Sequence, residues 1–229
     1  MRILFAAVLF PFYTAFFATA AMISALFSHK RLPTAIMKTW ARWILATSGL
    51  KVKVSGLENV SNEKPSIYMP NHASMVDIPI LIHMLPVDLR FIFKKSITLV
   101  PLVGWAIVAM GMVPIDRGNR GKARESLRKA GERIRGGFHI LVFPEGTRTR
   151  DGELLPFKKG GLVLALQESI DIVPVSLRGV RKLCSRNSII PSAGTIEMVI
   201  HPRIQTQQFS YDDRNKLMTE LRDTISSSL

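Results

Sequence analysis

The distribution of hydrophobic and polar residues divides the chain near residue 50. Residues 3–29 contain no Lys, Arg, Asp or Glu, and Phe, Leu, Ile, Val and Ala dominate the run. This run exceeds the ~20 apolar residues that a helix needs to cross a bilayer. Residues 34–50 then repeat apolar side chains at helical spacing, with Lys38 and Arg42 on the other side. This second pattern predicts an amphipathic helix.

Three interpretations of the apolar run stay open. A secretory signal peptide would combine Arg2 with the small residues 18–20, but the run continues well beyond that point. The second interpretation is a transmembrane anchor, and the third is a helix that enters one leaflet, bends near Pro11 and pairs with the amphipathic helix. Trp40 and Trp43 suit a membrane interface, although the amphipathic helix could simply pack on the domain. We expect residues 1–50 to form membrane-anchoring helices.

After Gly49 short β-rich runs alternate with helical stretches, which is typical of an α/β fold. We predict a single α/β domain over residues 51–229, with a mostly parallel or mixed β-sheet flanked by helices and preceded by the membrane-embedded helices. The predicted strands span residues 51–55, 66–69, 90–93, 112–115, 139–143, 172–177 and 196–200. The predicted helices span residues 75–85, 103–110, 122–135, 161–168 and 212–226. In such a sheet the cleft lies at the carboxyl ends of the strands.

The charge of the chain requires an anionic partner. A net charge of +14 attracts nucleic acid, acidic lipid headgroups and phosphorylated substrates alike. The first fifty residues contain no Asp or Glu, which is typical of a segment that faces anionic lipid. The long apolar start and the lack of interleaved aromatic and basic strands disfavour a nucleic-acid partner. The single cysteine, Cys184, excludes an internal disulfide.

Residues 71–77, with the sequence Asn-His-Ala-Ser-Met-Val-Asp, contain a candidate acid–base pair. A histidine is the side chain best suited to take a proton from a hydroxyl near neutral pH, and a carboxylate on its other ring nitrogen improves its basicity. At ~100° per residue, His72 and Asp77 would point apart on one continuous helix. They can meet only if His72 lies in a turn and Asp77 in the first turns of a helix. Asn71 or Ser74 could cap that helix. Otherwise His72 packs or caps and Asp77 is solvated.

Residues 141–150 form a second motif, in which an apolar strand stops at a proline and opens into a charged glycine turn. Gly146 lets the backbone approach a ligand closely, and Arg148 offers planar donors to a phosphate. Glu145 can accept hydrogen bonds from hydroxyl groups. The alternative is an ordinary surface turn with solvated charges.

Two basic sites lie between these motifs, each at the end of a predicted strand. The first is Lys94 with Lys95, and the second is Arg117 in the segment 113–117. Exposed basic residues usually belong to the general surface, but a strand end favours a site. The helix predicted for 122–135 is also basic, and we expect it to face solvent or lipid.

Together these motifs resemble the glycerolipid acyltransferase family and, within it, the bacterial 1-acylglycerol-3-phosphate acyltransferases. The four blocks occur in family order at residues 71–77, 113–117, 143–148 and 172–175. The resemblance implies that His72, oriented by Asp77, deprotonates the sn-2 hydroxyl of lysophosphatidic acid. This hydroxyl would attack the thioester of acyl-CoA or acyl-carrier protein and give phosphatidic acid, with no covalent acyl-enzyme.

The resemblance also implies where the acceptor binds. The candidate phosphate ligands are Lys94, Arg117 and Arg148, and Glu145, Gly146 and Thr147 are the other candidate substrate-binding residues. No metal or cofactor is expected, because the thioester is a co-substrate and the other histidines show no metal-ligand spacing.

These donors are cytosolic, so we expect a catalytic domain on the cytoplasmic face of the inner membrane, with the lipid bilayer as a partner. The main alternative is an acyltransferase of the same family that uses glycerol 3-phosphate, a lyso-phospholipid or a lyso-ornithine lipid. A non-catalytic membrane scaffold would leave the His72–Asp77 pair without a purpose.

Overall fold

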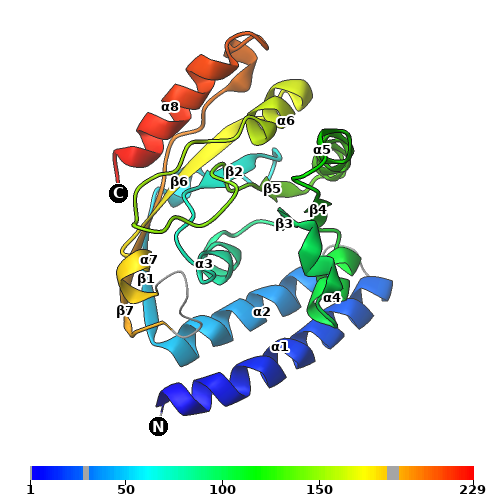
Figure 1. The fold of residues 1–229 in the computed structure, drawn as a ribbon, viewed down its shortest axis with the longest axis vertical. Helices are drawn as coiled ribbons and strands as arrows, with labels where there is room; N and C mark the ends of the chain where they lie inside the picture. The colour runs from blue at the N-terminus through cyan, green and yellow to red at the C-terminus, as the bar shows by residue number, and fades with distance from the viewer. Residues whose placement is uncertain (1, 28–30, 185–190) are drawn as a thin grey trace.

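A seven-stranded mixed sheet forms the centre of the computed structural model (Figure 1). The structure describes residues 2–27, 31–184 and 191–229, except for the side chains of 2–8 and 31. The interpretation of Arg2 as the basic start of a signal peptide therefore concerns a side chain outside the described ones. The strands are β1 (Leu50–Ser55), β2 (Ile67–Pro70), β3 (Leu89–Lys94), β4 (Val113–Ile115), β5 (His139–Leu141), β6 (Ile172–Arg178) and β7 (Gly194–Ile200). Their order is β1-β7-β6-β2-β5-β3-β4, and every pair is parallel except β6 with β7. The predicted α/β fold is confirmed.

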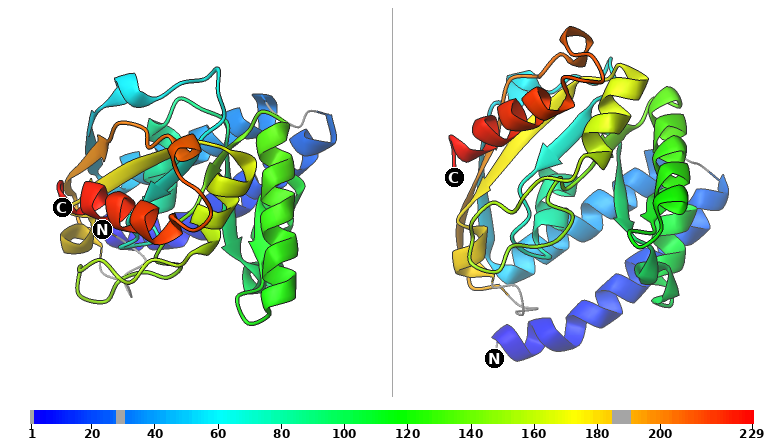
Figure 2. Two further views of the ribbon diagram at one scale, coloured as in Figure 1. Left: turned by 90° about the horizontal axis from the view of Figure 1, so that it is seen from above. Right: turned by 45° about the horizontal axis from the view of Figure 1, so that its top comes forward.

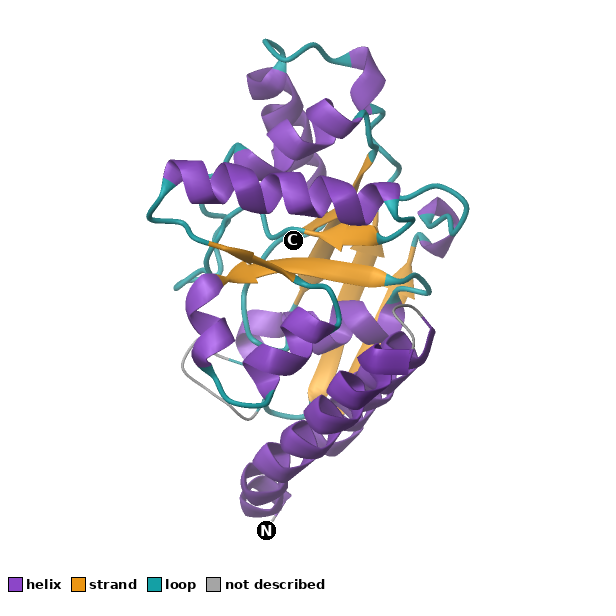
Figure 3. Ribbon diagram, turned by 90° about the vertical axis from the view of Figure 1, so that its right-hand side faces the viewer, coloured by secondary structure: helices purple, strands orange, loops and turns teal. Residues whose placement is uncertain are grey.

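Helices cover both faces of the sheet, as Figure 3 shows with the strands in orange. One face carries α2 (Arg31–Ser48) and α3 (Asp77–Met84), and α1 (Arg2–Phe27) lies outside α2, against α4 (Val103–Ala109). The other face carries α5 (Arg120–Arg135), α6 (Gly160–Glu168) and α8 (Arg214–Ser226). Shorter elements are η1 (Leu57–Asn59), η2 (Lys95–Leu99), α7 (Val180–Leu183) and η3 (Thr206–Gln208). α1 and α8 thus lie on opposite sides of the molecule (Figure 2).

Strand β2 shows why the sheet needs helices on both faces. Tyr68 is fully buried in the core shared with α2 and α3. Its neighbours Ile67 and Met69 are fully buried in the core shared with α5, α6 and α8. Successive side chains of a strand point to opposite faces of the sheet. A strand of uninterrupted apolar residues therefore needs a covering layer on each face.

Helix α2 packs on the domain and also holds α1. Its residues Ala41 and Leu45 are buried in the same core cluster as α3. On the α1 side, the Trp40 Nε1 atom donates to the Thr14 Oγ1 atom at 3.4 Å. α2 therefore packs on the domain, as one of the interpretations of the amphipathic helix predicts.

Helix α1 continues through Pro11 as one α-helix. Its segment Leu9–Phe27 has a mean hydropathy of 1.6, so it is long and apolar enough to cross a membrane by length and composition. Figure 1 shows α1 at the outer side of the molecule. An apolar helix with much of its surface exposed requires an apolar environment or a partner.

The parallel strands bring the predicted site residues to one edge of the sheet. Neighbouring strands β2, β5, β3 and β4 all run in the same direction, so their carboxyl ends lie together. His72 follows β2, residues 145–148 follow β5, Lys94 ends β3 and Arg117 follows β4. The predicted location of the cleft at this edge follows from the strand order.

The buried His139 makes the stability of the fold depend on pH. Its Nδ1 atom accepts a hydrogen bond from the Ser66 backbone N–H at 3.2 Å. Burial, helped by the charge of Arg203, lowers the pKa of His139 from 6.5 to about 4. Between these two pH values the unfolded chain binds a proton at this residue and the folded chain does not. Stability contributed by neutral His139 is therefore present above pH 6.5 and is lost as the pH falls towards about 4.

We expect the His139→Gln variant to lose less stability than the wild type over this pH range. Glutamine does not titrate, and its amide oxygen can still accept from the Ser66 N–H group. The measurement is the melting temperature in detergent at a series of pH values. Parallel curves for the two proteins would mean that His139 is not a source of the acid sensitivity.

Candidate active site

His72 and Asp77 meet where the chain turns from β2 into α3. The His72 Nδ1 atom lies 2.7 Å from the Asp77 Oδ2 atom. The same Oδ2 atom accepts hydrogen bonds from the backbone N–H groups of Ala73 (2.7 Å) and Ser74 (2.8 Å). Asp77 is the fully buried first residue of α3, so the helix dipole also favours its carboxylate. The predicted geometry, with His72 in the turn and Asp77 in the first helical turn, is confirmed.

Further contacts fix the His72 imidazole and its backbone. The ring stacks on Phe143, with 3.8 Å between the ring centroids and 21° between the planes. The Thr149 N–H group donates to the His72 carbonyl at 2.9 Å. Since Nδ1 faces the Asp77 carboxylate, Nε2 is the nitrogen that can accept a substrate proton.

The expected cap of α3 by Asn71 or Ser74 is wrong. Val76 occupies the N-cap position and makes no side-chain cap hydrogen bond. The Asn71 side chain instead bonds both backbone groups of Leu177, donating to its oxygen at 3.1 Å and accepting from its nitrogen at 2.7 Å. The Asp77 carboxylate already satisfies the N–H groups at the start of this turn. Asn71 therefore fixes the segment between β2 and α3, which carries His72, to β6.

The Glu145 carboxylate binds the backbone of the segment that carries His72. Its Oε1 atom accepts from the His72 N–H group at 2.6 Å, and its Oε2 atom accepts from the Leu155 N–H group at 3.0 Å. Burial raises the pKa of the Glu145 carboxyl, while the two N–H groups favour its charged form. The sequence predicts that Glu145 contacts substrate hydroxyl groups, but both of its oxygens accept from backbone donors, since a buried carboxyl requires hydrogen-bond partners. Glu145 positions His72 and does not line the cavity described next.

A cavity of about 520 Å³ opens beside His72 and collects the predicted basic residues. The predicted site residues in its lining are His72, Lys94, Arg117, Gly146, Thr147 and Arg148. Its apolar lining includes Met75, Ile78, Phe91, Phe93, Ile97 and Phe143. The cavity thus combines a proton acceptor, cationic groups for an anion and an apolar wall.

Two contacts arrange the cationic side of the cavity. The Arg117 guanidinium donates to the Gly146 carbonyl, which joins the loop after β4 to the loop after β5. Burial lowers the pKa of Arg117, although a guanidinium remains charged at neutral pH. Lys95 pairs with Asp116 at 3.8 Å, so Lys94 is the member of the lysine pair that lines the cavity.

Lys158 is a further cationic residue of the cavity that the sequence analysis missed. Gly146 has φ +70°, and a Cβ atom there would lie 2.9 Å from the Lys158 Cδ atom. The signal for this residue was the basic pair at 158–159 directly before two glycines at the start of α6. Gly146 thus allows the Lys158 side chain to pass close to the loop.

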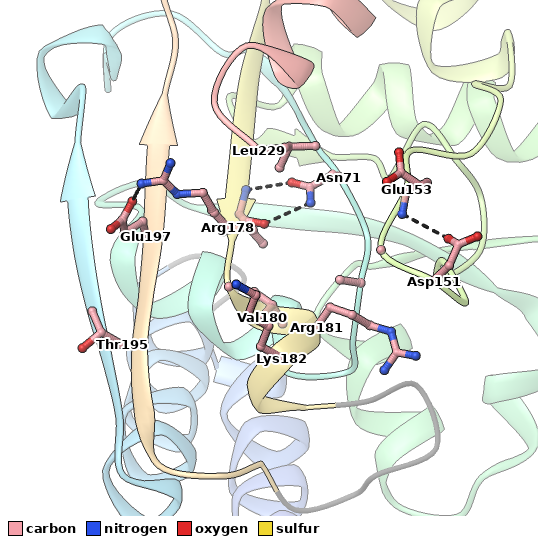
Figure 4. Close-up of a pocket in the computed structure, with 14 residues that line it drawn as sticks. Asn71, Asp151, Glu153, Arg178, Val180, Arg181, Lys182, Thr195, Glu197 and Leu229 are labelled. Atoms are coloured by element: carbon pink, nitrogen blue, oxygen red, sulfur yellow. Dashed lines mark hydrogen bonds and ion pairs between the residues drawn. The ribbon is translucent and has the colours of Figure 1, made fainter.

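A second hollow of about 660 Å³ is lined by Asn71 and by residues of β6, α7 and β7 (Figure 4). Figure 4 shows Asn71 at its wall, bonded to the β6 backbone, and the ion pair of Arg178 with Glu197. Another wall residue, Arg181, donates to the Arg150 carbonyl. None of the predicted catalytic or phosphate-binding residues lines this hollow, so the candidate active site is the cavity beside His72.

Comparison with known proteins identifies the family of this domain. The family model described as "Acyltransferase" matches residues 51–178, which contain all four sequence blocks. The chain belongs to the acyltransferase family. This confirms the family predicted from the sequence blocks.

Named relatives place the chain more closely within this family. The 1-acyl-sn-glycerol-3-phosphate acyltransferase of Borreliella burgdorferi is 30% identical over 199 residues, covering 87% of this chain and 80% of that protein. A chloroplastic enzyme with the same activity name from Brassica napus is 34% identical over 196 residues, covering 85% of this chain and 55% of that protein. The chain thus spans about half the length of this plant relative.

A solved structure shares the fold. The crystal structure of the 1-acyl-sn-glycerophosphate acyltransferase PlsC from Thermotoga maritima aligns with a TM-score of 0.80 and 24% sequence identity. The alignment covers 99% of this chain and 92% of that one, so the α1–α2 helices are included in the similarity.

Proposed function

We propose that the chain transfers an acyl group from a thioester, acyl-CoA or acyl-carrier protein, to the sn-2 hydroxyl of 1-acyl-sn-glycerol 3-phosphate, giving phosphatidic acid. The observation that carries the proposal is the His72–Asp77 contact of 2.7 Å beside a cavity with cationic walls. The activity named for the relatives from Borreliella burgdorferi and Brassica napus supports the same reaction.

The geometry of the pair supports a general-base mechanism. The His72 Nε2 atom takes the proton of the acceptor hydroxyl while its oxygen attacks the thioester carbonyl. Asp77 holds the imidazole in orientation and stabilises the imidazolium ion that forms. The C–S bond then breaks, and the thiolate leaving group takes the proton from His72. The lipid oxygen is the nucleophile, so no covalent acyl-enzyme forms.

The cationic residues of the cavity position the acceptor. Lys94, Arg117 and Arg148 come from three different strand ends and can hold one phosphate from several sides. Gly146 and Thr147, in the same lining, would contact the glycerol portion. Charge-assisted contacts of this kind fix the hydroxyl near His72 and convert binding energy into orientation.

The apolar helix α1 supports a location at the lipid bilayer. Thioester donors are cytosolic, so the cavity would face the cytoplasmic side of the inner membrane. Neither a metal nor a bound cofactor enters the proposed steps.

A panel of acceptors tests the proposal. Purified protein in vesicles would receive lysophosphatidic acid, glycerol 3-phosphate, lyso-phosphatidylcholine or lyso-ornithine lipid, each with acyl-CoA or acyl-carrier protein. We expect the highest kcat/KM with lysophosphatidic acid, measured by mass spectrometry of the product. A preference for another acceptor would assign the same chemistry to a different lipid, and no acyl transfer to any acceptor would refute the proposal.

We expect Arg148→Ala to raise the KM for lysophosphatidic acid about 10–100-fold, since a hydrogen bond to a charged group contributes roughly 1.5–3 kcal/mol. The KM for the acyl donor should change much less, because Arg148 is assigned to the acceptor's phosphate. Arg150→Ala is the matched control, because Arg150 is exposed and lies outside the cavity lining. Equal changes in both KM values would show that Arg148 serves the donor or the structure.

A further inference from the structure

An uncharged segment joins β3 to β4 on the side of the molecule where α1 lies. Residues 96–115 contain no Asp, Glu, Lys or Arg. Four large apolar side chains of this segment are exposed: Leu99 (80%), Val100 (45%), Trp105 (53%) and Val108 (45%). We call these four residues the η2–α4 patch. Exposed apolar side chains gathered in one place mark a surface that meets a partner or a membrane.

The backbone beneath the patch is preformed. Leu102 has φ 60° and ψ −60°, and the Val103 N–H group donates to the Pro101 carbonyl at 2.7 Å. This is a γ-turn of the strained hand, which a residue with a side chain rarely adopts. A Cβ atom on Gly104 would lie 2.3 Å from the Ile97 carbonyl oxygen, so α4 and η2 pack backbone to backbone. The segment is therefore a compact unit that presents its apolar side chains outward.

The patch continues an apolar surface formed by the first two helices. α4 packs against α1, as Figure 1 shows at the right of the molecule. Among the described residues, sixteen large hydrophobic side chains are exposed, and six of them lie on α1, two on α2 and four in the patch. On α1 they include Phe12 (70%) and Phe16 (68%). The other four are scattered over the rest of the described chain, so the exposed apolar surface is concentrated on one side.

We propose that the η2–α4 patch inserts into the lipid bilayer as a second membrane contact, next to α1 and at the mouth of the active-site cavity. A bilayer is the occupant that fits three features of the surface. The patch is continuous with a helix apolar enough to cross a membrane, and it contains a tryptophan, which is favoured at membrane interfaces. The segment 96–115 also carries no Asp, Glu, Lys or Arg side chain, so its insertion places no charged group in the lipid.

The patch adjoins the active-site cavity, so its insertion would also serve the delivery of substrate. Lys94 and Ile97 line the cavity, and the exposed Leu99 and Val100 follow them directly. This step rests on the proposed function: a lysolipid lying in the bilayer would pass along η2 to bring its phosphate to Lys94. The patch would then hold the cavity mouth at the level of the headgroups, while α1 supplies the general attachment.

Tryptophan fluorescence tests the insertion without using the enzymatic activity. Wild type and Trp105→Phe would be bound to phosphatidylethanolamine–phosphatidylglycerol vesicles, with and without bromine on the acyl chains. The difference between the two proteins is the emission of Trp105, and we expect it to shift to the blue on vesicle binding and to be quenched by bromine. A Tyr211→Trp variant, with the added tryptophan just ahead of α8, should add emission that brominated lipid does not quench.

Two outcomes would overturn the proposal. Trp105 emission that brominated lipid leaves unquenched, while sedimentation shows the protein bound, would place the patch outside the bilayer. Emission that shifts with protein concentration instead, without lipid, would assign the patch to a second copy of the chain.

A kinetic experiment tests the role of the patch in substrate delivery. The double variant Leu99→Glu, Trp105→Glu should raise the KM for long-chain lysophosphatidic acid in vesicles at least about tenfold, because two large apolar side chains that favour insertion are replaced by two charged groups that oppose it. The kinetics with a short-chain, monomeric lysolipid should stay unchanged, and Tyr211→Glu should match wild type with both substrates. Equal kinetics for the double variant and wild type in vesicles would refute the delivery role. Absence of acyl transfer by the wild type would refute the proposed function alone, because the fluorescence result does not depend on it.

Discussion

Replacement of His72 by alanine is expected to lower phosphatidic acid formation about 10²–10⁴-fold, the usual contribution of a positioned general base. In the proposed mechanism the imidazole is the proton acceptor, and no other group assigned to that mechanism can replace it. The KM for lysophosphatidic acid should change little, because the cationic residues proposed to hold the phosphate remain. The measurement is the initial rate in vesicles, with the melting temperature and vesicle sedimentation as checks on folding and membrane binding.

His83→Ala is the matched control for this variant. His83 lies near the carboxyl end of α3, the helix that begins at Asp77, and is outside the cavity lining. We expect this variant to keep the wild-type rate. Full activity of a folded, membrane-bound His72→Ala protein would eliminate the general-base role of His72.

Replacement of Asp77 by asparagine is expected to lower kcat by about 10³–10⁴-fold, by analogy with the loss of the aspartate in a serine-hydrolase triad. One carboxylate oxygen of Asp77 accepts from the His72 ring and from two backbone N–H groups. An amide oxygen can take the place of this one carboxylate oxygen, but the amide carries no negative charge. The imidazole should therefore lose the stabilisation of its charged form, and with it most of its strength as a base.

Asp212→Asn serves as the control for the change from carboxylate to amide, because the Asp212 side chain is almost fully exposed at 97%. We expect this control to have the wild-type kcat. An Asp77→Asn protein with a kcat within a factor of about three of wild type would show that His72 works without a carboxylate partner, against the triad analogy.

The sequence predicted the strands well because their apolar runs are short and bounded by turn residues. The strands β2, β3, β5 and β6 each overlap a predicted run, and their parallel order explains why motifs far apart in the chain meet. The His72–Asp77 contact was predictable from spacing, since a five-residue separation requires a turn followed by a helix start.

The direction of individual side chains was not predictable. Glu145 stands beside Gly146 in the chain, yet its carboxylate turns to the backbone of His72 and Leu155. These partners are 73 and 10 residues away in sequence, so local pattern gives no sign of the contact. Lys158 was missed for the same reason, because contacts beyond its local sequence bring it to the cavity: its backbone N–H group donates to the Pro144 carbonyl at 2.8 Å, and its side chain passes close to Gly146.

The exposed η2–α4 patch also emerged from packing alone. The sequence predicted a helix over 103–110, and an apolar helix of a domain is normally expected to be buried. In the structure Gly104 and Ala106 face the interior, and Trp105 and Val108 face outward. Which side chains of α4 are exposed therefore depends on which side of this helix packs against α1.

The most direct test of the central claim follows a labelled acyl group from its thioester to its acceptor. The wild-type protein would receive acyl-CoA carrying a radiolabelled acyl chain, either alone, with lysophosphatidic acid, or with an analogue that lacks the sn-2 hydroxyl. If the lipid hydroxyl is activated by His72 and attacks directly, all transferred label will be in phosphatidic acid, and the protein will stay unlabelled in all three samples. Label that becomes covalently attached to the protein in the absence of lysophosphatidic acid, and then moves to the lipid, would contradict this mechanism.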